Sequence, residues 1–236
     1  MLDSKIKFVA QTARYARSYF GWSVFAVFWL PMCLGALLGM RATMGSQSQQ
    51  ELRAGQEFAW VDGDFDSAEK SFKKVVLDYP GGPYASQAYF EWAQVKEIRG
   101  EQGESVAVLY ASSARLSTDP QWAAEASMKA AKHWEQASAY DQAASYYSKA
   151  KEHPSQQDHA LHALASLALA QGHVDVAMER FQILTESRNS KWSNMGQMGV
   201  SVSYARLGEL NAALAEVDQD SDRRERLFER ISALRR

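Results

Sequence analysis

The chain has 236 residues, of which 46% are hydrophobic and 23% are charged, the balance of an ordinary globular protein with room for one sizeable domain. Residues 1–41 hold 5 of the 26 basic residues and 1 of the 28 acidic ones, a formal charge of +4, which leaves 21 basic and 27 acidic residues, a formal charge of −6, in the rest. Because a body with this negative excess is a poor ligand for nucleic acid, we expect no nucleic-acid partner.

The N-terminal part of the chain predicts a membrane anchor. No charged residue occurs from Ser18 to Met40, and these 23 residues are long enough, as a helix, to cross about 30 Å of hydrocarbon. Four basic residues precede the run and only Arg41 follows it closely, so the positive-inside rule places residues 1–17 in the cytoplasm. We therefore predict a single transmembrane helix over residues 18–41, in contact with the lipid bilayer, and the remaining chain on the other side of the membrane.

Two other interpretations of this segment stay open. A cleaved signal peptide also has a basic start and an apolar run, but this run is longer than cleavage requires, and the best small-residue site, Thr43 to Gly45, follows an arginine. The single cysteine, Cys33, raises the alternative of a lipoprotein. Pro31 and Met32 before it do not suit that processing, and apolar sequence continues after it. We favour an uncleaved anchor.

After the apolar run, the sequence predicts pairs of helices. Residues 42–50 are polar and predict a short linker. The first pair joins a helix over residues 51–61 to a second helix that follows Gly63 and ends before Pro80. Glycine at the turn allows the chain to reverse tightly, and proline ends the unit because it cannot continue a helix.

A small residue recurs where the two helices of each pair approach most closely, at intervals of 34 to 39 residues. These residues are Ala68, Ala107, Ala143, Ala177 and Ala213. In several pairs an aromatic residue follows one turn later and fills the seam, as Phe72 does after Ala68. This pattern resembles the tetratricopeptide repeat family, whose period is about 34 residues.

The resemblance implies an all-α fold, a right-handed solenoid of about five helix pairs over residues 51–220. The turn of the third pair, residues 137–139, lacks glycine, so its geometry stays open, and Gly208 is expected to form the turn of the fifth pair. Residues 221–236 place Leu227, Ile231 and Leu234 on one side of a helix. We predict that this amphipathic helix caps the end of the stack.

The same resemblance implies a partner-binding surface, because in this family the first helix of each pair lines a concave face. The candidate partner-binding residues are Arg53, Trp60, Tyr89, Trp92, Lys96, Arg99, Met128, Lys132, His159 and His162. Such a mixture of aromatic, methionine and charged side chains can hold a peptide or a helix. Glu57 and Glu125 occupy places where the family's carboxylate clamp needs asparagine or lysine, so that clamp is not expected.

Three aromatic residues of this surface are the predicted anchors for a partner: Trp60, Tyr89 and Trp92. They fall in the concave register, where folding alone has less use for large rings than the seams have. The alternative stays open that these rings belong to the core and close the first pair onto the second.

No catalytic constellation stands out in the sequence. His159 and His162 lie three residues apart on a predicted helix, with His153 nearby, which could bring imidazoles together for a metal. Apart from Asp158, however, no cysteine or close acidic cluster completes a coordination set. We therefore predict no catalytic residue, no metal, no cofactor and no small-molecule substrate, and hence a protein that is not an enzyme.

These features together predict a membrane-anchored scaffold that binds protein partners and supports the assembly or stability of a membrane or envelope complex. The layout is similar to that of periplasmic tetratricopeptide proteins associated with translocons and of envelope assembly factors. We expect a bacterial inner membrane, with the N-terminus cytoplasmic and the repeats periplasmic. The alternatives are an import receptor on an organelle membrane, with cytosolic repeats, and an accessory chaperone of a translocon.

Overall fold

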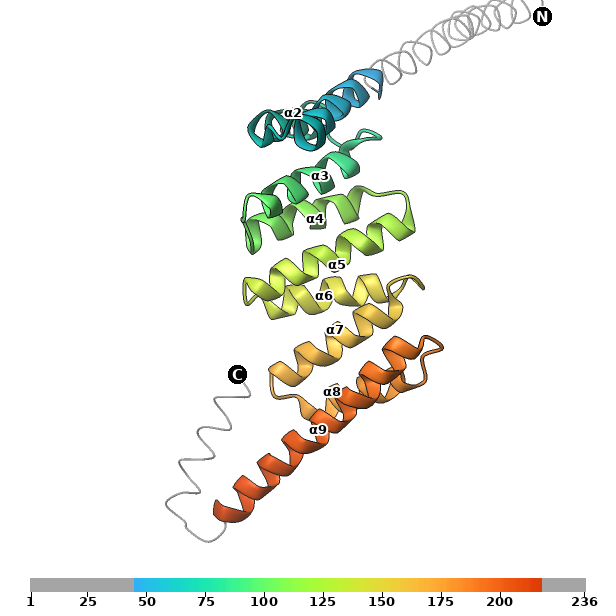
Figure 1. Ribbon diagram of the computed structural model, residues 1–236. Helices are drawn as coiled ribbons and strands as arrows, with labels where there is room; N and C mark the ends of the chain where they lie inside the picture. Colours follow the sequence, from blue (N-terminus) through green and yellow to red (C-terminus); the bar gives the residue numbers. More distant parts are fainter. Residues whose placement is uncertain (1–44, 218–236) are drawn as a thin grey trace, which may run out of the picture. The chain divides into compact units, whose positions relative to one another are not determined.

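The computed structural model describes residues 45–217, and every regular element in this range is helical (Figure 1). The predicted cytoplasmic N-terminus, the transmembrane helix over 18–41 and the capping helix over 221–236 lie outside the described residues. The chain divides into two units, residues 1–50 and 51–236, which we describe separately. Within residues 45–217, none of the helices combines the length and the apolar character that spanning a bilayer requires.

Residues 45–57 are helical, so the predicted linker over 42–50 is helical in its described part. A short π-helix follows, and then eight α-helices within the described range. The elements are η1 (Phe58–Asp62), α2 (Phe65–Asp78), α3 (Ala85–Ile98), α4 (Glu104–Leu116), α5 (Pro120–Gln136), α6 (Tyr140–Lys151), α7 (Gln157–Ala170), α8 (Val174–Thr185) and α9 (Ser190–Val217).

Local sequence explains where the helices begin and turn. The carboxylate of Asp64 accepts a hydrogen bond from the backbone N–H of Ser67 at the start of α2. Gly63 before it has a φ of 70°, a left-handed conformation that glycine adopts without steric cost. In the third pair, whose turn lacks glycine, Ser138 takes the same left-handed region with a φ of 59°. The geometry left open at 137–139 is therefore that of a left-handed turn without glycine.

Within the unit 51–236, each helix packs against the next one along the chain, and α7 also packs against α9 (Figure 1). The core is a series of small clusters along these seams, each built from neighbouring helices. The predicted close-packing residues Ala68, Ala107, Ala143 and Ala177 have no exposed surface. This confirms the predicted spacing for the first four pairs.

The predicted fifth pair is wrong. Residues 190–217 form the single helix α9, which passes through Gly208 without a turn. One glycine in a helix interior costs only about 1 kcal/mol, and the flanking Leu207 and Glu209 favour helix. No proline or capping residue adjoins Gly208 to help end the helix there. The described part of the unit thus holds four helix pairs followed by one long helix.

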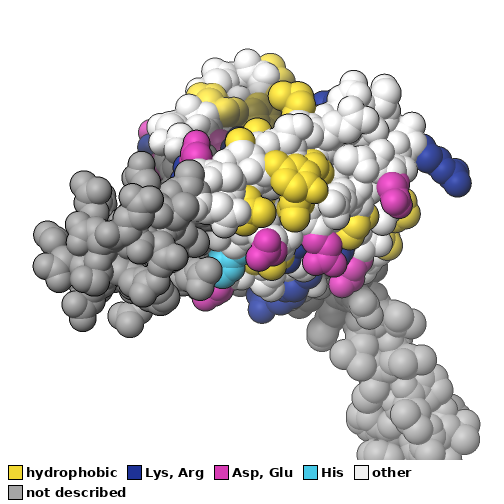
Figure 2. Space-filling model, turned by 90° about the horizontal axis from the view of Figure 1, so that it is seen from below, with side chains coloured by type: hydrophobic (Ala, Val, Ile, Leu, Met, Phe, Trp, Pro, Cys, Tyr) yellow, Lys and Arg dark blue, Asp and Glu magenta, His cyan; other side chains and the backbone are white. Residues whose placement is uncertain are grey.

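Helix α9 also carries exposed apolar side chains. Met198, Val202 and Tyr204 are the exposed large hydrophobic residues of its described part. Figure 2 views the molecule from below Figure 1, from the α9 end, and shows hydrophobic side chains among polar ones on this face. On the side of α8, by contrast, Val200 of α9 packs against the cluster that contains Phe181.

A tightly packed seam predicts a specific effect of overpacking. Replacing the fully buried Ala177 of α8 with leucine should lower the free energy of unfolding by about 1 to 3 kcal/mol, because the added methylenes have no room. Thermal melting followed by circular dichroism measures this effect. Ala170→Leu, at an exposed position at the end of α7, is the matched control and should leave the melting temperature nearly unchanged. Equal effects of the two changes would contradict the assigned seam.

Candidate partner-binding surface

Most of the predicted partner-binding residues are accessible in the structure. Arg53, Trp60, Arg99, Lys132 and His159 are exposed, and Tyr89, Trp92, Lys96 and His162 are half-buried. Met128 is the exception, with 8% of its surface exposed, because it packs in the core cluster shared by α5, α6 and α7. Packing therefore accounts for the position of Met128, and the prediction that it faces a partner is corrected.

Trp60 lies at the surface on the π-helix η1, with 47% of its side chain exposed. Its indole Nε1 donates to Oε2 of Glu91 in α3 over 3.4 Å. Glu91 is buried, and its other oxygen, Oε1, accepts hydrogen bonds from Gln56 at 2.6 Å and Gln87 at 2.8 Å. The neighbouring Val61 is also exposed. The wider turn of a π-helix, often found at functional sites, thus presents an indole and a valine to solvent.

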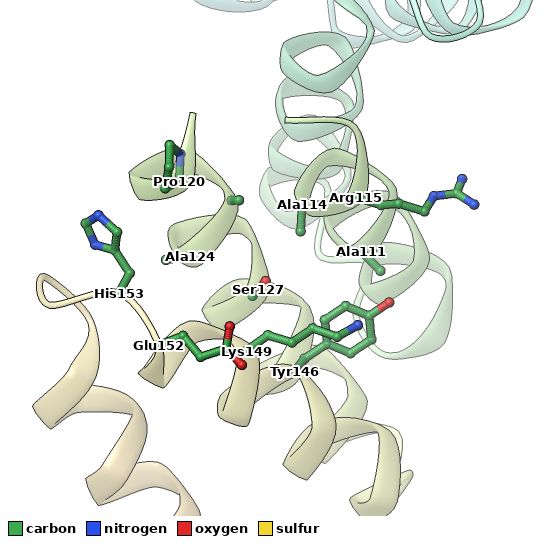
Figure 3. A pocket seen from close by; sticks show the side chains of 11 residues that line it. Ala111, Ala114, Arg115, Pro120, Ala124, Ser127, Tyr146, Lys149, Glu152 and His153 are labelled. Atoms are coloured by element: carbon green, nitrogen blue, oxygen red, sulfur yellow. The ribbon is translucent and has the colours of Figure 1, made fainter. Parts of the chain in front are cut away.

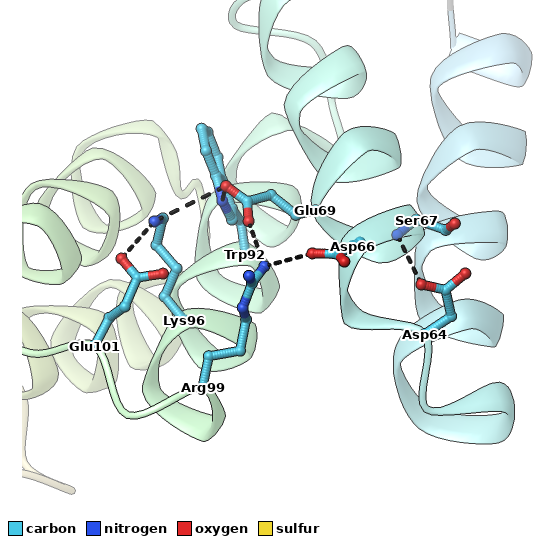
Figure 4. Close-up of polar contacts among 8 residues, drawn as sticks. All are labelled: Asp64, Asp66, Ser67, Glu69, Trp92, Lys96, Arg99 and Glu101. Carbon is cyan, nitrogen blue, oxygen red and sulfur yellow. Dashed lines mark hydrogen bonds and ion pairs between the residues drawn. The ribbon is translucent and has the colours of Figure 1, made fainter.

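Trp92 takes part in a polar network between α2 and α3 (Figure 4). Its indole Nε1 donates to Oε1 of Glu69 over 3.1 Å. Arg99 Nη1 lies 3.1 Å from Oε2 of Glu69 and 2.9 Å from Oδ1 of Asp66. Lys96 Nζ lies 2.7 Å from Oε2 of Glu101 and 3.9 Å from Glu69. The predicted partner-binding residues Trp92, Lys96 and Arg99 therefore link α3 to α2 and to the turn that follows α3.

The rings of Tyr89 and Trp92 also contact the core. Both pack against the cluster of the first pair, which includes Phe72 and Val95, and against the cluster of the second, which includes Phe90. Trp92 therefore has a role in core packing. Trp60 has less of one, because nearly half of its surface is exposed. Partner contact by any of the three aromatic residues stays a prediction.

A second aromatic group lies where α7 meets the start of α9. The ring of His159 stacks on Trp192 with 5.3 Å between centroids, and that of His162 lies 5.8 Å from both Trp192 and Phe181. Burial lowers the pKa of both histidines, the charge of His159 lowers that of His162 further, and the charge of Lys191 adds to the effect in both. The sequence did not single out Trp192, because its partners are about 30 residues away on another helix.

Glu97 of α3 lies at the centre of a polar cluster that joins three helices. Tyr110 Oη donates to its Oε2 at 2.5 Å, and Lys129 Nζ lies 3.3 Å from the same oxygen. His133 Nε2, on a ring that is almost fully buried, lies 2.7 Å from Oε1. Partial burial acts to raise the pKa of Glu97, but the hydrogen bonds from His133 and Tyr110 and the charge of Lys129 outweigh it and hold the pKa at about 2.

Contacts within this cluster, together with burial, shift the pKa values of Glu97 and Tyr110. Burial, with the hydrogen bond to Glu97, raises the pKa of Tyr110 above its usual range, so the phenol remains a donor. None of the four side chains lines the cavity described next. In residues 45–217, no three His, Cys, Asp or Glu side chains converge as they would around a metal. The hydrogen bonds of the Glu97 cluster join α3, α4 and α5.

A cavity of about 490 Å³ opens between α4, α5 and α6 (Figure 3). Small residues of α4 and α5 form much of its wall, and Tyr146 and Lys149 of α6 lie along one side with Glu152, which directly follows α6. None of the predicted partner-binding residues lines it. The sequence did not predict this cavity. It arises because the facing side chains of α4 and α5 are small and no side chain of α6 fills the space between them.

The stacked antiparallel pairs, with a buried alanine at the same place in each, have the tetratricopeptide repeat fold. A solved tetratricopeptide repeat protein from Parabacteroides merdae is similar, with a TM-score of 0.56 and 17% identity over 75% of this chain and 69% of that one. The solved MamA protein has a TM-score of 0.51 and 16% identity over 75% of this chain and 96% of its own. No protein-family model and no curated protein matches the sequence.

Proposed function

We propose that this protein is a non-enzymatic scaffold that is anchored in a membrane and binds a protein partner through its first helices. Its role would be to support the assembly or stability of a membrane or envelope protein complex. The observation that carries the proposal is the exposed indole of Trp60, held at the surface of a repeat fold by a buried carboxylate, beside the exposed Val61. Repeat stacks of this kind use extended surfaces to bind other proteins.

The proposed anchor rests on the uncharged run over residues 18–40 and on the basic residues that precede it. We place the N-terminus in the cytoplasm and the repeats in the periplasm of a bacterium. The acidic balance of the chain after residue 41 suits a protein-binding role better than a nucleic-acid-binding one.

Substitutions of Trp60 and Trp92 distinguish a loss of partner binding from a loss of core packing. Replacing Trp60 with alanine should weaken recovery of the partner about tenfold, since an exposed aromatic anchor contributes about 1.4 kcal/mol or more, and should leave the melting temperature nearly unchanged. Replacing Trp92 should cost about 2 kcal/mol or more of folding stability, because its ring contacts two core clusters and its indole binds Glu69. Quantitative affinity purification from detergent-solubilised membranes, combined with thermal melting, measures both effects.

The result that would count against a binding role for Trp60 is unchanged partner recovery from the Trp60→Ala protein. A fall in melting temperature as large as that of Trp92→Ala would instead assign Trp60 to the core. Leu77→Ala, at an exposed apolar position on α2, controls for the loss of exposed apolar surface and should change neither measurement.

The anchor has its own test. Extraction of membranes with alkaline carbonate should leave the full-length protein in the pellet, whereas a chain that starts at Gln47 should be recovered in the supernatant and should be helical. Recovery of the protein in the supernatant, with a new N-terminus near residue 46, would establish cleavage and contradict the anchor.

A further inference from the structure

The cavity between α4, α5 and α6 is large enough for a ligand and is walled by small side chains. Its volume of about 490 Å³ lies within the range of about 300 to 1,000 Å³ that is usual for ligand sites. Ala111 and Ala124 are buried in its wall, and Ala114 and Ala123 are half-buried. Methyl groups from two helices therefore form an apolar floor on which a bulky side chain can lie.

A serine in this wall has a hydroxyl that is free to bond to an occupant of the cavity. Ser127 of α5 is 4% exposed, lines the cavity, and its hydroxyl has no hydrogen bond within residues 45–217. The other three buried serines of the described residues are hydrogen-bonded: Ser113 accepts from Trp122 at 3.2 Å, and Ser48 and Ser203 donate to the carbonyls of Gly45 at 3.0 Å and Gly199 at 2.8 Å. The Ser127 oxygen is not among the fully buried unpaired side-chain atoms of the described residues, which are Nδ1 of His133 and Nε1 of Trp134, so it is accessible within the cavity and can bond to an occupant.

The rim of the cavity is positively charged, in contrast to the rest of the body. Arg115 and Lys149 line it against one carboxylate, Glu152, with His153 beside them. Neither Arg115 nor Lys149 forms an ion pair with any residue in the described part of the chain. Lys149 Nζ lies 4.3 Å from the centroid of the Tyr146 ring, and Figure 3 shows the two side chains next to each other. Arg115 extends outward at the rim.

We propose that this cavity is a second protein-binding site, which takes an acidic segment of a partner and encloses one of its bulky apolar side chains. The apolar side chain lies on the alanine floor beside Tyr146. A backbone group of the segment hydrogen-bonds to Ser127, and carboxylates of the segment pair with Lys149 and Arg115. The unpaired cations in a chain that is otherwise acidic supply the charge complementarity. The site is separate from the surface around Trp60, so its test is independent of that proposal.

The probe is a short fluorescein-labelled peptide in which aspartate and glutamate flank a single tryptophan, added to the full-length protein in detergent. Fluorescence anisotropy should show saturable binding. Lys149→Glu should weaken binding about tenfold or more, since it reverses a charge at the contact. Lys151→Glu makes the same change two residues away, at an exposed position of α6 that does not line the cavity, and should change the affinity little.

Filling the cavity tests the apolar part of the site. Ala114→Phe should abolish binding of the peptide, and Ala123→Leu is the second variant if the first fails to fold. Ala170→Phe, outside the cavity, should bind normally. Ser127→Ala should weaken binding about fivefold, the effect of one lost hydrogen bond of about 1 kcal/mol.

Three results would overturn the proposal. These are absence of saturable binding, equal weakening by Lys149→Glu and Lys151→Glu, and unchanged binding by both folded cavity-filling variants. A peptide with serine in place of tryptophan that binds equally well, and that inorganic phosphate displaces, would show a simple anion site and would also contradict it. If Trp60→Ala loses partner recovery but still binds the peptide, the result would support a peptide site that is separate from the surface around Trp60.

Discussion

Replacing Gly196 with alanine is expected to lower the free energy of unfolding by about 2 to 3 kcal/mol, whereas the same replacement of Gly208 should raise it by up to about 1 kcal/mol. Both glycines lie in α9 and both changes add one methyl group. The two effects differ in sign because the surroundings of the two glycines differ. Denaturant unfolding of the two variants, beside the unchanged protein, measures them.

The cost at Gly196 comes from the backbone of α8. A Cβ atom at this position would lie 2.7 Å from the backbone N of Thr185, and 2.9 Å from both the carbonyl carbon of Leu184 and the carbonyl oxygen of Phe181. No side-chain rotation relieves these contacts, so α9 must move away from α8. Gly199 makes a similar close approach, but to the Phe181 ring, where a Cβ atom would lie 2.3 Å from Cδ1.

The expected gain at Gly208 tests the continuous helix. No atom lies within 4 Å of a Cβ built at this position, so alanine adds no clash and restores helix propensity. If Gly208 formed the turn of a fifth helix pair, alanine there would instead be strained and would destabilise the protein. A loss of stability in Gly208→Ala would therefore contradict α9 as one helix.

The second large effect is expected at Glu97. Replacing it with leucine should cost about 2 to 3 kcal/mol, because the buried His133 and the Tyr110 hydroxyl lose their common acceptor and Lys129 loses its ion pair. Glu101→Leu removes a half-buried ion-pair partner of Lys96 and should cost at most about 1 kcal/mol. Similar losses of stability in the two variants would show that the Glu97 cluster contributes no more to folding than the ion pair of Glu101 and Lys96.

The same cluster predicts a dependence on pH. The pKa of Glu97 is lowered in the folded protein from 4.5 to about 2, so the unfolded chain binds this proton more readily. The added stability is fully present above pH 4.5 and is lost as the pH falls through about 2. Glu97→Gln cannot lose it, so the stability of the unchanged protein should fall more steeply over this interval. Parallel pH profiles of the two proteins would contradict the prediction.

Residue spacing was sufficient to predict the first four helix pairs. Ala68 and Ala177 mark places where two backbones approach, and such places recur with the repeat because each pair stacks in the same way on the next. The turn at Gly208 was predicted wrongly because glycine permits a turn but does not require one. At Gly63 a capping aspartate follows, whereas at Gly208 helix-forming residues lie on both sides.

The candidate sites were less predictable, for two physical reasons. The partners of Glu97 are 13, 32 and 36 residues away, on helices whose connecting turns differ in length, so their meeting cannot be calculated from a repeat period. Trp60 and Trp92 belong to the same predicted surface, yet only the structure shows how differently they are buried. Ser127 likewise has no sequence signal, because its unpaired hydroxyl depends on what the facing helices leave out.

Alanine makes up 17 of the 34 buried hydrophobic residues in the described part of the chain. Alanine side chains interdigitate less deeply than large ones, so by themselves they only weakly resist the sliding of one helix along its neighbour by a turn. Directional contacts prevent this: the Trp92–Glu69 hydrogen bond, the Glu97 cluster and the bond from Tyr147 to Glu135 at 2.8 Å each hold only at one register. These polar contacts thus determine the register in which neighbouring helices pack, which alanine packing alone does not determine.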